Sequence, residues 1–139
     1  MKIKIRDFSE NPLLRHCDIS DYSGEEYYHS ILNEAFKNAL EKKEKLSVDL
    51  DGVAGYAPSF LDEAFGCLIY DFSKDVVSAN LEIQSTEEPD WIDFLEDSFN
   101  QWEERRRQNN PPKVTQKHAP WWRIGKKGLE CGLWRECDA

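Results

Sequence analysis

The stretch VDLDGVAGYAPSFLDEAFGCL, from Val48 to Leu68, decides the fold. It begins as an apolar, strand-like run, which the Asp-Gly, Gly-Tyr and Pro-Ser pairs then break with residues typical of turns. Directly behind Pro58 the apolar residues restart with helical spacing. The stretch therefore predicts a strand, a turn and a helix, which is a unit that lets a helix pack against a sheet.

Strands and helices are predicted to alternate on both sides of this unit. The first helix has the clearest signals, because Ser23 and Glu26 form an S-x-x-E capping box and the apolar residues behind them keep helical spacing. The third strand is predicted from the alternation of apolar and polar residues between Val77 and Ile83. Gly66 inside the second helix costs about 1 kcal/mol relative to Ala, which indicates close packing against a neighbouring element. The predicted elements are a strand at 2–8, a helix at 23–45, a strand at 45–50, a helix at 60–69, a strand at 76–85 and a helix at 89–107.

The formal charge divides the chain into two parts. Residues 1–104 carry nine Lys and Arg against 24 Asp and Glu, a charge of −15, whereas the segment from Arg105 onward carries nine against three, a charge of +6. Two asparagines and two adjacent prolines at 109–112 mark a linker. The sequence therefore predicts an α/β domain over 1–107, a small sheet with helices packed against it, followed over 108–139 by a linker and a basic, tryptophan-rich C-terminal extension.

The hydropathy of the chain and the spacing of its cysteines indicate the cellular compartment in which we expect the protein. No run approaches the ~18 apolar residues that a membrane span needs, and MKIKIRDFSENP lacks the apolar core of a signal peptide. The four cysteines do not have the spacing of a disulfide framework. We therefore expect a cytoplasmic, reduced protein that has no membrane partner.

Two segments, SGEEYY at 23–28 and VDLDGVAGYAPSFLDEAFGCL at 48–68, closely resemble the bacterial STAS-like domain family. That family reads much like SGE-x-F, then (V/L)DLDG and GYGSSFLEEAFGGL. The resemblance runs from about Lys2 to Ile83 and does not reach the tail. The family is similar in turn to the STAS domain, which is the fold of bacterial anti-sigma-factor antagonists, and this implies a small STAS-like sheet covered by helices.

The resemblance also implies a partner-switching role. In STAS domains a partner kinase phosphorylates a serine at the start of the helix after the central strand, and the phosphate changes which protein the domain holds. By position, Val48–Leu50 corresponds to that strand, Ser59 to the serine and Phe60–Leu68 to the helix. The implied partner is an ATP-binding kinase of the anti-sigma-factor, GHKL type, so this chain would bind no cofactor itself. The chain differs from the pattern in two places, because it lacks the Asp-Ser-Ser-Gly of STAS domains and has Pro58 in place of a small residue.

Ser59 has two interpretations. Its hydroxyl suits an N-cap, with Pro58 holding the entering chain and Asp62 completing an approximate capping box. Alternatively it is a phospho-acceptor, and its phosphate would meet the backbone N–H groups and the positive end of a helix. For the second interpretation, the predicted partner-binding surface consists of Gly55, Tyr56, Pro58, Ser59, Asp62 and Glu63.

Several other polar residues are of the types that catalyse reactions or bind metal ions. Asp49 and Asp51 lie on one side of a strand, where paired carboxylates can bind Mg²⁺, but the Asp-Gly sequence favours a turn. The sequence does not bring its histidines and cysteines together, and it contains no phosphate loop, nucleophile elbow or H-E-x-x-H motif. Cys131 and Cys137, with His118, lack the C-x2-C spacing and the fourth ligand of a zinc knuckle. The sequence therefore predicts neither an enzyme nor a metal site.

The tail interleaves Trp121, Trp122 and Trp134 with five basic residues. Such a pattern can stack on bases and neutralise phosphates. In the other interpretation the tail folds back on the acidic body, or on a second copy in a homodimer, and buries its indoles there. The sequence favours this second interpretation, because the acidic field of the body opposes nucleic acid.

The sequence thus predicts a non-enzymatic regulatory module that binds another protein, with partner switching through Ser59. The alternative is an acidic bacterial or phage inhibitor whose carboxylates imitate nucleic-acid phosphates and block a nucleic-acid-binding protein. A switch should depend on Ser59. A decoy should bind a basic protein in a strongly salt-dependent way.

Overall fold

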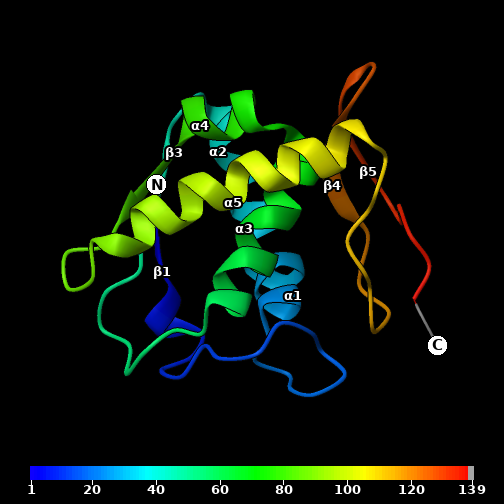
Figure 1. Ribbon diagram of the computed structural model, residues 1–139. Helices are drawn as coiled ribbons and strands as arrows, with labels where there is room; N and C mark the ends of the chain where they lie inside the picture. The colour runs from blue at the N-terminus through cyan, green and yellow to red at the C-terminus, as the bar shows by residue number, and fades with distance from the viewer. Residues whose placement is uncertain (138–139) are drawn as a thin grey trace.

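The computed structural model describes residues 1–137, in which a parallel sheet and a hairpin lie on opposite sides of a group of helices (Figure 1). The sheet has the strand order β1-β2-β3, formed by β1 (Lys2–Lys4), β2 (Leu46–Asp49) and β3 (Leu81–Gln84). Both pairings are parallel, and Val48 lies between Ile3 and Ile83. The strand of the opening stretch is therefore the central one, and the predicted α/β fold is confirmed.

A long helical segment leads from β1 to β2. After a short 3₁₀ turn, η1 (Ile5–Asp7), and a loop, it consists of α1 (Gly24–Tyr27), a π-helical segment η2 (Tyr28–Leu32) and α2 (Asn33–Lys42). The Ser23 hydroxyl accepts a hydrogen bond from the Glu26 N–H at 3.1 Å, which confirms that half of the capping box. The Glu26 carboxylate instead accepts one from Gln116 of the tail at 3.0 Å.

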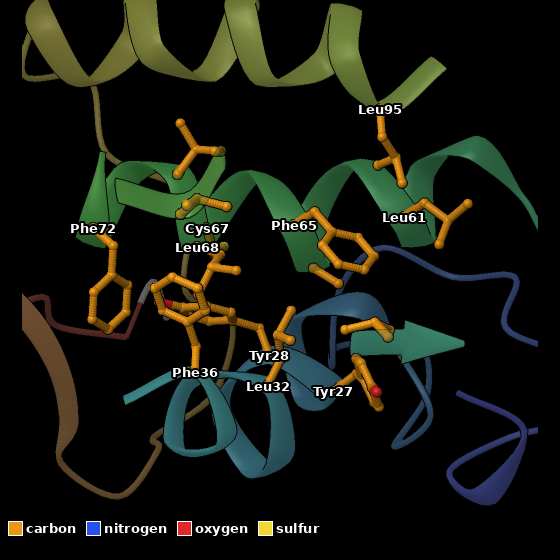
Figure 2. Packing of buried hydrophobic residues seen from close by; sticks show 14 of the residues in the cluster. Tyr27, Tyr28, Leu32, Phe36, Leu61, Phe65, Cys67, Leu68, Phe72 and Leu95 are labelled. Atoms are coloured by element: carbon orange, nitrogen blue, oxygen red, sulfur yellow. The ribbon is translucent and has the colours of Figure 1, made fainter. Parts of the chain in front are cut away.

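The central helix is α3 (Pro58–Phe72), which is buried at twelve of its fifteen positions. The α1–α2 segment covers one side of it, and α5 (Asp90–Arg107) covers another. Figure 2 shows Tyr28 and Phe36 approaching α3 from the first helical segment and Leu95 approaching it from α5. The core therefore surrounds α3 rather than lying on one face of it.

Helix α5 packs tightly against α3 at Gly66. A Cβ atom added to Gly66 would overlap the indole ring of Trp102. The ring is held in place, because its Nε1 donates to Asp62 at 3.0 Å and the Arg105 guanidinium lies over it at 4.1 Å from the ring centroid. The prediction that Gly66 marks close packing is confirmed.

The segment 76–85 is only half a strand. Helix α4 (Lys74–Asn80) occupies its first part and β3 only its end, so the prediction of one continuous strand is wrong. Val77 and Ala79 would share a face in a strand, but in the helix Val77 is buried and Ala79 is exposed. The helix begins at this point because the Ser73 hydroxyl accepts a hydrogen bond from the Val76 N–H at 3.4 Å and so caps it. The strand is short because only four residues of β2 pair with β3.

The tail is an ordered structural element. It forms an antiparallel hairpin of β4 (Trp121–Gly125) and β5 (Gly128–Gly132) against the helices. The Asn33 amide donates to the Trp122 carbonyl at 2.9 Å and accepts from the Trp122 N–H at 2.8 Å, and Trp121 enters the same core as α3. The interpretation in which the tail folds back on its own body is confirmed, while a domain boundary at residue 107 stays a prediction.

Among residues 1–137, none of the helices combines the length and the apolar character needed to cross a lipid bilayer.

The packing at Gly66 predicts the effect of a single methyl group. We expect Gly66→Ala to lower the free energy of unfolding by roughly 1–3 kcal/mol, because overpacking against Trp102 outweighs the gain of about 1 kcal/mol in helix propensity. Urea unfolding followed by circular dichroism measures this change. Gly55→Ala is the matched control, since a Cβ there meets no atom within 4 Å, and equal stability of the two variants would contradict the packing account.

Candidate functional site

The start of α3 lies under a loop formed by residues 9–22. The Ala54 N–H donates to the Glu10 carbonyl at 2.9 Å, and the Ala57 N–H donates to the Pro12 carbonyl at 3.2 Å. Arg15 of the same loop reaches α3 and binds Asp62 at 2.7 Å. The loop and the turn before α3 therefore form one surface.

The prediction of Ser59 as the N-cap is wrong. Helix α3 begins at Pro58 with Ala57 in the cap position, and no side chain caps it. Proline suits the first helical position because its fixed φ is already helical and it has no N–H to satisfy, which places the helix start two residues earlier than predicted. The Ser59 hydroxyl, on a half-exposed residue, instead donates a long 3.5 Å hydrogen bond to the Leu13 carbonyl.

Asp62 does not complete a capping box either. Its carboxylate accepts hydrogen bonds from the Ser98 hydroxyl at 2.5 Å and from Trp102, in addition to its ion pair with Arg15. These partners come from α5 and from loop 9–22. Asp62 therefore clamps three segments together, which explains why its side chain turns away from the helix start.

The remaining residues of the predicted partner-binding surface differ in their exposure. Pro58 is exposed, Gly55 is half exposed, and Tyr56 is half buried with its hydroxyl donating to the Leu50 carbonyl at 2.5 Å. Glu63 does not belong to this surface, since it is only 2% exposed and binds Arg15 at 3.1 Å inside the protein.

Loop 9–22 adds an apolar component that the sequence analysis missed. Its Leu13, Ile19 and Tyr22 are 48%, 73% and 59% exposed, although large apolar side chains are usually buried. The α3-start surface is defined here as Leu13, Ile19, Tyr22, Pro58 and Ser59. It joins exposed apolar side chains to a hydroxyl.

The turn interpretation of Asp49 and Asp51 is confirmed. Asp49 accepts a hydrogen bond from the Asp51 N–H at 2.9 Å and contacts Arg6 at 3.4 Å. Asp51 accepts from the hydroxyl of Thr86 at 2.6 Å and from the N–H of Glu87 at 2.9 Å, and these bonds lower its pKa. Both carboxylates thus serve the connection of β2 to the loop after β3.

A second group of polar residues gathers where the tail meets α1. The Glu25 cluster is defined here as His16, Cys17, Glu25, Thr115 and His118. Its centre is the fully buried Glu25 carboxylate, which lies 2.6 Å from His118 Nε2 and 3.1 Å from His16 Nδ1. The same carboxylate accepts from the Thr115 hydroxyl at 2.6 Å, the Thr115 N–H at 3.1 Å and the Cys17 N–H at 3.2 Å.

This arrangement shifts the pKa values of three groups. Burial alone would raise the pKa of Glu25, but the hydrogen bonds from His118, Thr115 and Cys17 lower it well below its usual value. Burial raises the pKa of the Cys17 thiol to about 12. His29 stacks on His118 with 3.9 Å between ring centroids, and burial together with the charge of His118 lowers the pKa of His29 to about 3.

The tertiary structure therefore brings together residues that the sequence keeps apart. Glu25 and His118 are 93 positions apart, and no local pattern links them. Among residues 1–137, the group able to hold a metal ion joins His118 to Cys17 and Glu25 rather than to Cys131 and Cys137. The donors that could hold a metal ion are therefore not those of the zinc knuckle weighed from the sequence, apart from His118.

A cavity of about 440 Å³ opens beside the Glu25 cluster. His118 forms part of its wall, together with Trp121, Trp134 and Arg135 of the tail. The Trp134 indole N–H donates to the Trp121 carbonyl at 2.8 Å, so the three predicted tail tryptophans contact their own chain. The cavity is therefore a product of the docked tail.

A parallel three-stranded sheet, helices packed against it and a serine at the start of the helix after the central strand define a STAS-like α/β domain. The family model described as a STAS-like domain of unknown function (DUF4325) matches residues 23–91. The matched part, which is similar to this family, runs from the cap of α1 into the start of α5. No curated protein and no solved structure matches the chain.

The geometry of Glu25 predicts a large stability effect for a small change. We expect Glu25→Gln to lower the free energy of unfolding by about 3 kcal/mol, because it removes the buried charge and turns a donor toward other donors. Urea unfolding measured in EDTA checks this. Glu41→Gln is the matched control, because Glu41 is 51% exposed and pairs with Lys37 at the surface, and a similar loss in both variants would contradict the central role of Glu25.

The lowered pKa of His29 predicts a pH dependence. Below pH 6.5 the unfolded chain protonates His29, whereas the folded chain does so only near pH 3, so acidification should reduce stability by up to ~1.4 kcal/mol per pH unit from this group. Asp71, whose pKa is raised to about 6 by burial, contributes with the opposite sign below pH 6. The measurement is therefore the difference between the wild type and His29→Gln from pH 6.5 to 5, where parallel curves would refute the assignment.

Proposed function

We propose that this protein is a non-enzymatic regulatory module that binds another protein through the α3-start surface. The observation that carries the proposal is the half-exposed Ser59 hydroxyl, which makes one long hydrogen bond to the carbonyl of the exposed Leu13. Exposed apolar groups next to a modifiable hydroxyl suit a surface that is bound and then released. STAS-like domains are protein-interaction modules, which agrees with this use of the surface.

The proposed partner is an ATP-binding kinase of the anti-sigma-factor, GHKL type. The kinase would transfer the γ-phosphoryl group of ATP to the Ser59 oxygen, with ADP as the leaving group and the hydroxyl proton passing to the kinase's base. All of this chemistry would belong to the partner.

The charges around Ser59 support a switching effect of the phosphate. Arg15 pairs with Asp62, which lies three residues after Ser59 and therefore on the same side of α3. A phosphate on Ser59 would repel the Asp62 carboxylate and compete with it for Arg15. Because Arg15 holds loop 9–22 against α3, this competition would move the exposed apolar side chains of the loop.

A specific observation favours the second candidate function, an acidic inhibitor that imitates nucleic acid. Exposed carboxylates follow one another along the loop before α5 and the first half of that helix. They belong to Glu87, Glu88, Asp90, Asp93, Glu96 and Asp97. This acidic row would bind a basic protein by electrostatic attraction, without any need for Ser59.

One set of variants tests the switch. The full chain is used to isolate its partner from the source cell, and the affinity of the purified pair is then measured for the wild type, Ser59→Asp and Ser78→Asp. We expect an ATP-binding partner that phosphorylates Ser59, binding at least about tenfold weaker for Ser59→Asp, and no change for Ser78→Asp, which alters an exposed serine of α4.

A stability control and the nature of the partner complete the test of the switch. Because the Ser59 hydroxyl caps no helix, Ser59→Ala should change the free energy of unfolding by less than about 0.5 kcal/mol. A loss of binding in that variant would therefore not be caused by unfolding. A basic nucleic-acid-binding partner with strongly salt-dependent affinity that ignores Ser59 would favour the acidic inhibitor instead.

A further inference from the structure

The Glu25 cluster contains the donor atoms of a metal site. Cys17 Sγ, a Glu25 carboxylate oxygen and a His118 nitrogen lie within 4.8 Å of one another, and all three residues are buried. Thiolate, imidazole and carboxylate are the ligands that Zn²⁺ takes in proteins, at bond lengths of about 2.0–2.3 Å. Donors around a tetrahedral ion of that size are about 3–4 Å apart. Small side-chain movements would therefore place these atoms around one ion.

A fourth donor lies next to these three. His16 Nδ1 is 3.1 Å from one Glu25 oxygen, while His118 Nε2 is 2.6 Å from the other. The carboxylate thus lies between two imidazoles, one from loop 9–22 and one from the tail. His16 contacts Glu25 and is not among the three residues whose donor atoms all lie within 4.8 Å of one another, so it would have to turn toward them to complete a four-ligand set.

The surroundings of His118 are those of a metal ligand. Its Nδ1 lies 3.7 Å from a Glu26 carboxylate oxygen, which leaves Nε2 directed at the centre of the cluster. A carboxylate behind a histidine fixes the ring and raises its basicity at many zinc sites. The Ser23 hydroxyl lies 3.3 Å from Cys17 Sγ, and the hydrogen bond between them fixes the position of the sulfur.

The charge balance of the cluster also favours a cation. Glu25 and Glu26 place two carboxylates beside the Cys17 sulfur. Within residues 1–137, the Glu25 carboxylate contacts two imidazoles, a hydroxyl and backbone N–H groups, and the Glu26 carboxylate contacts the Cys17 thiol, the Gln116 amide and the His118 ring. A divalent cation held by Cys17, Glu25 and His118 would add positive charge beside these two carboxylates.

We propose that His16, Cys17, Glu25 and His118 bind Zn²⁺ and that the ion fastens loop 9–22, α1 and the tail to one another. On binding, the Cys17 thiol forms a Zn–S bond and releases its proton to solvent. One of the proposed ligands, His118, also lines the cavity that the tail forms. The site is independent of Ser59 and of the proposed switch.

Cobalt binding tests the proposal. The full-length chain, stripped with EDTA and kept reduced, is titrated with Co²⁺ and then with Zn²⁺, and thiolate-to-cobalt absorption and bound metal are measured. We expect one ion per chain, displacement of Co²⁺ by Zn²⁺, and loss of the thiolate band in Cys17→Ser. Cys131→Ser is the matched control, because Cys131 is exposed and outside the cluster, and it should keep the band.

Two further measurements separate loss of binding from loss of folding. Glu26→Gln should weaken metal binding about 10–100-fold, because Glu26 is not a ligand itself but lies behind His118 and beside the Cys17 sulfur. Zn²⁺ should raise the melting temperature of the wild type and of Cys131→Ser but not that of Cys17→Ser. The proposal is overturned if the wild type binds no stoichiometric metal, or if the band survives in Cys17→Ser and disappears in Cys131→Ser.

Discussion

A helix that is buried at twelve of its fifteen positions can face water on almost no side, and α3 imposes this constraint on the whole protein. The sheet has strands of only three or four residues and covers a limited area. The α1–α2 segment and α5 therefore enclose α3 from two further directions, as Figure 2 shows, and β4 of the tail adds a third. The tail is thus part of the cover that a fully buried helix requires.

Buried and partly buried carboxylates hold these covering segments in one arrangement. Asp62 joins α3 to α5 and to loop 9–22, and Glu25 joins α1 to that loop and to the tail. Asp71 accepts from the Tyr28 hydroxyl at 2.5 Å and lies 3.8 Å from the Arg135 guanidinium. Apolar packing alone would tolerate several arrangements, whereas a desolvated carboxylate is stable only where its donors are.

Loop 9–22 takes part in both regions for which we propose a role. Leu13, Ile19 and Tyr22 belong to the α3-start surface, while His16 and Cys17 belong to the Glu25 cluster. The loop has no helix or strand of its own, so its shape depends on these anchors and on Arg15. The loop carries both an outward apolar surface and an inward set of donors, because Leu13 and Ile19 are exposed whereas Cys17 between them is buried.

The sequence by itself determined the features that depend on local order. The spacing of apolar residues located the α1–α2 segment, α3 and α5, and the interior glycine Gly66 indicated the close approach that Trp102 makes. The tertiary structure alone decided that residues 74–80 are helical, that Glu63 is buried and that Ser59 caps nothing. It also assembled the Glu25 cluster, because hydrogen bonds between residues up to 93 positions apart leave no periodic signal in the chain. Local propensity acts over a few residues, whereas burial and the pairing of buried charges depend on which distant segments meet.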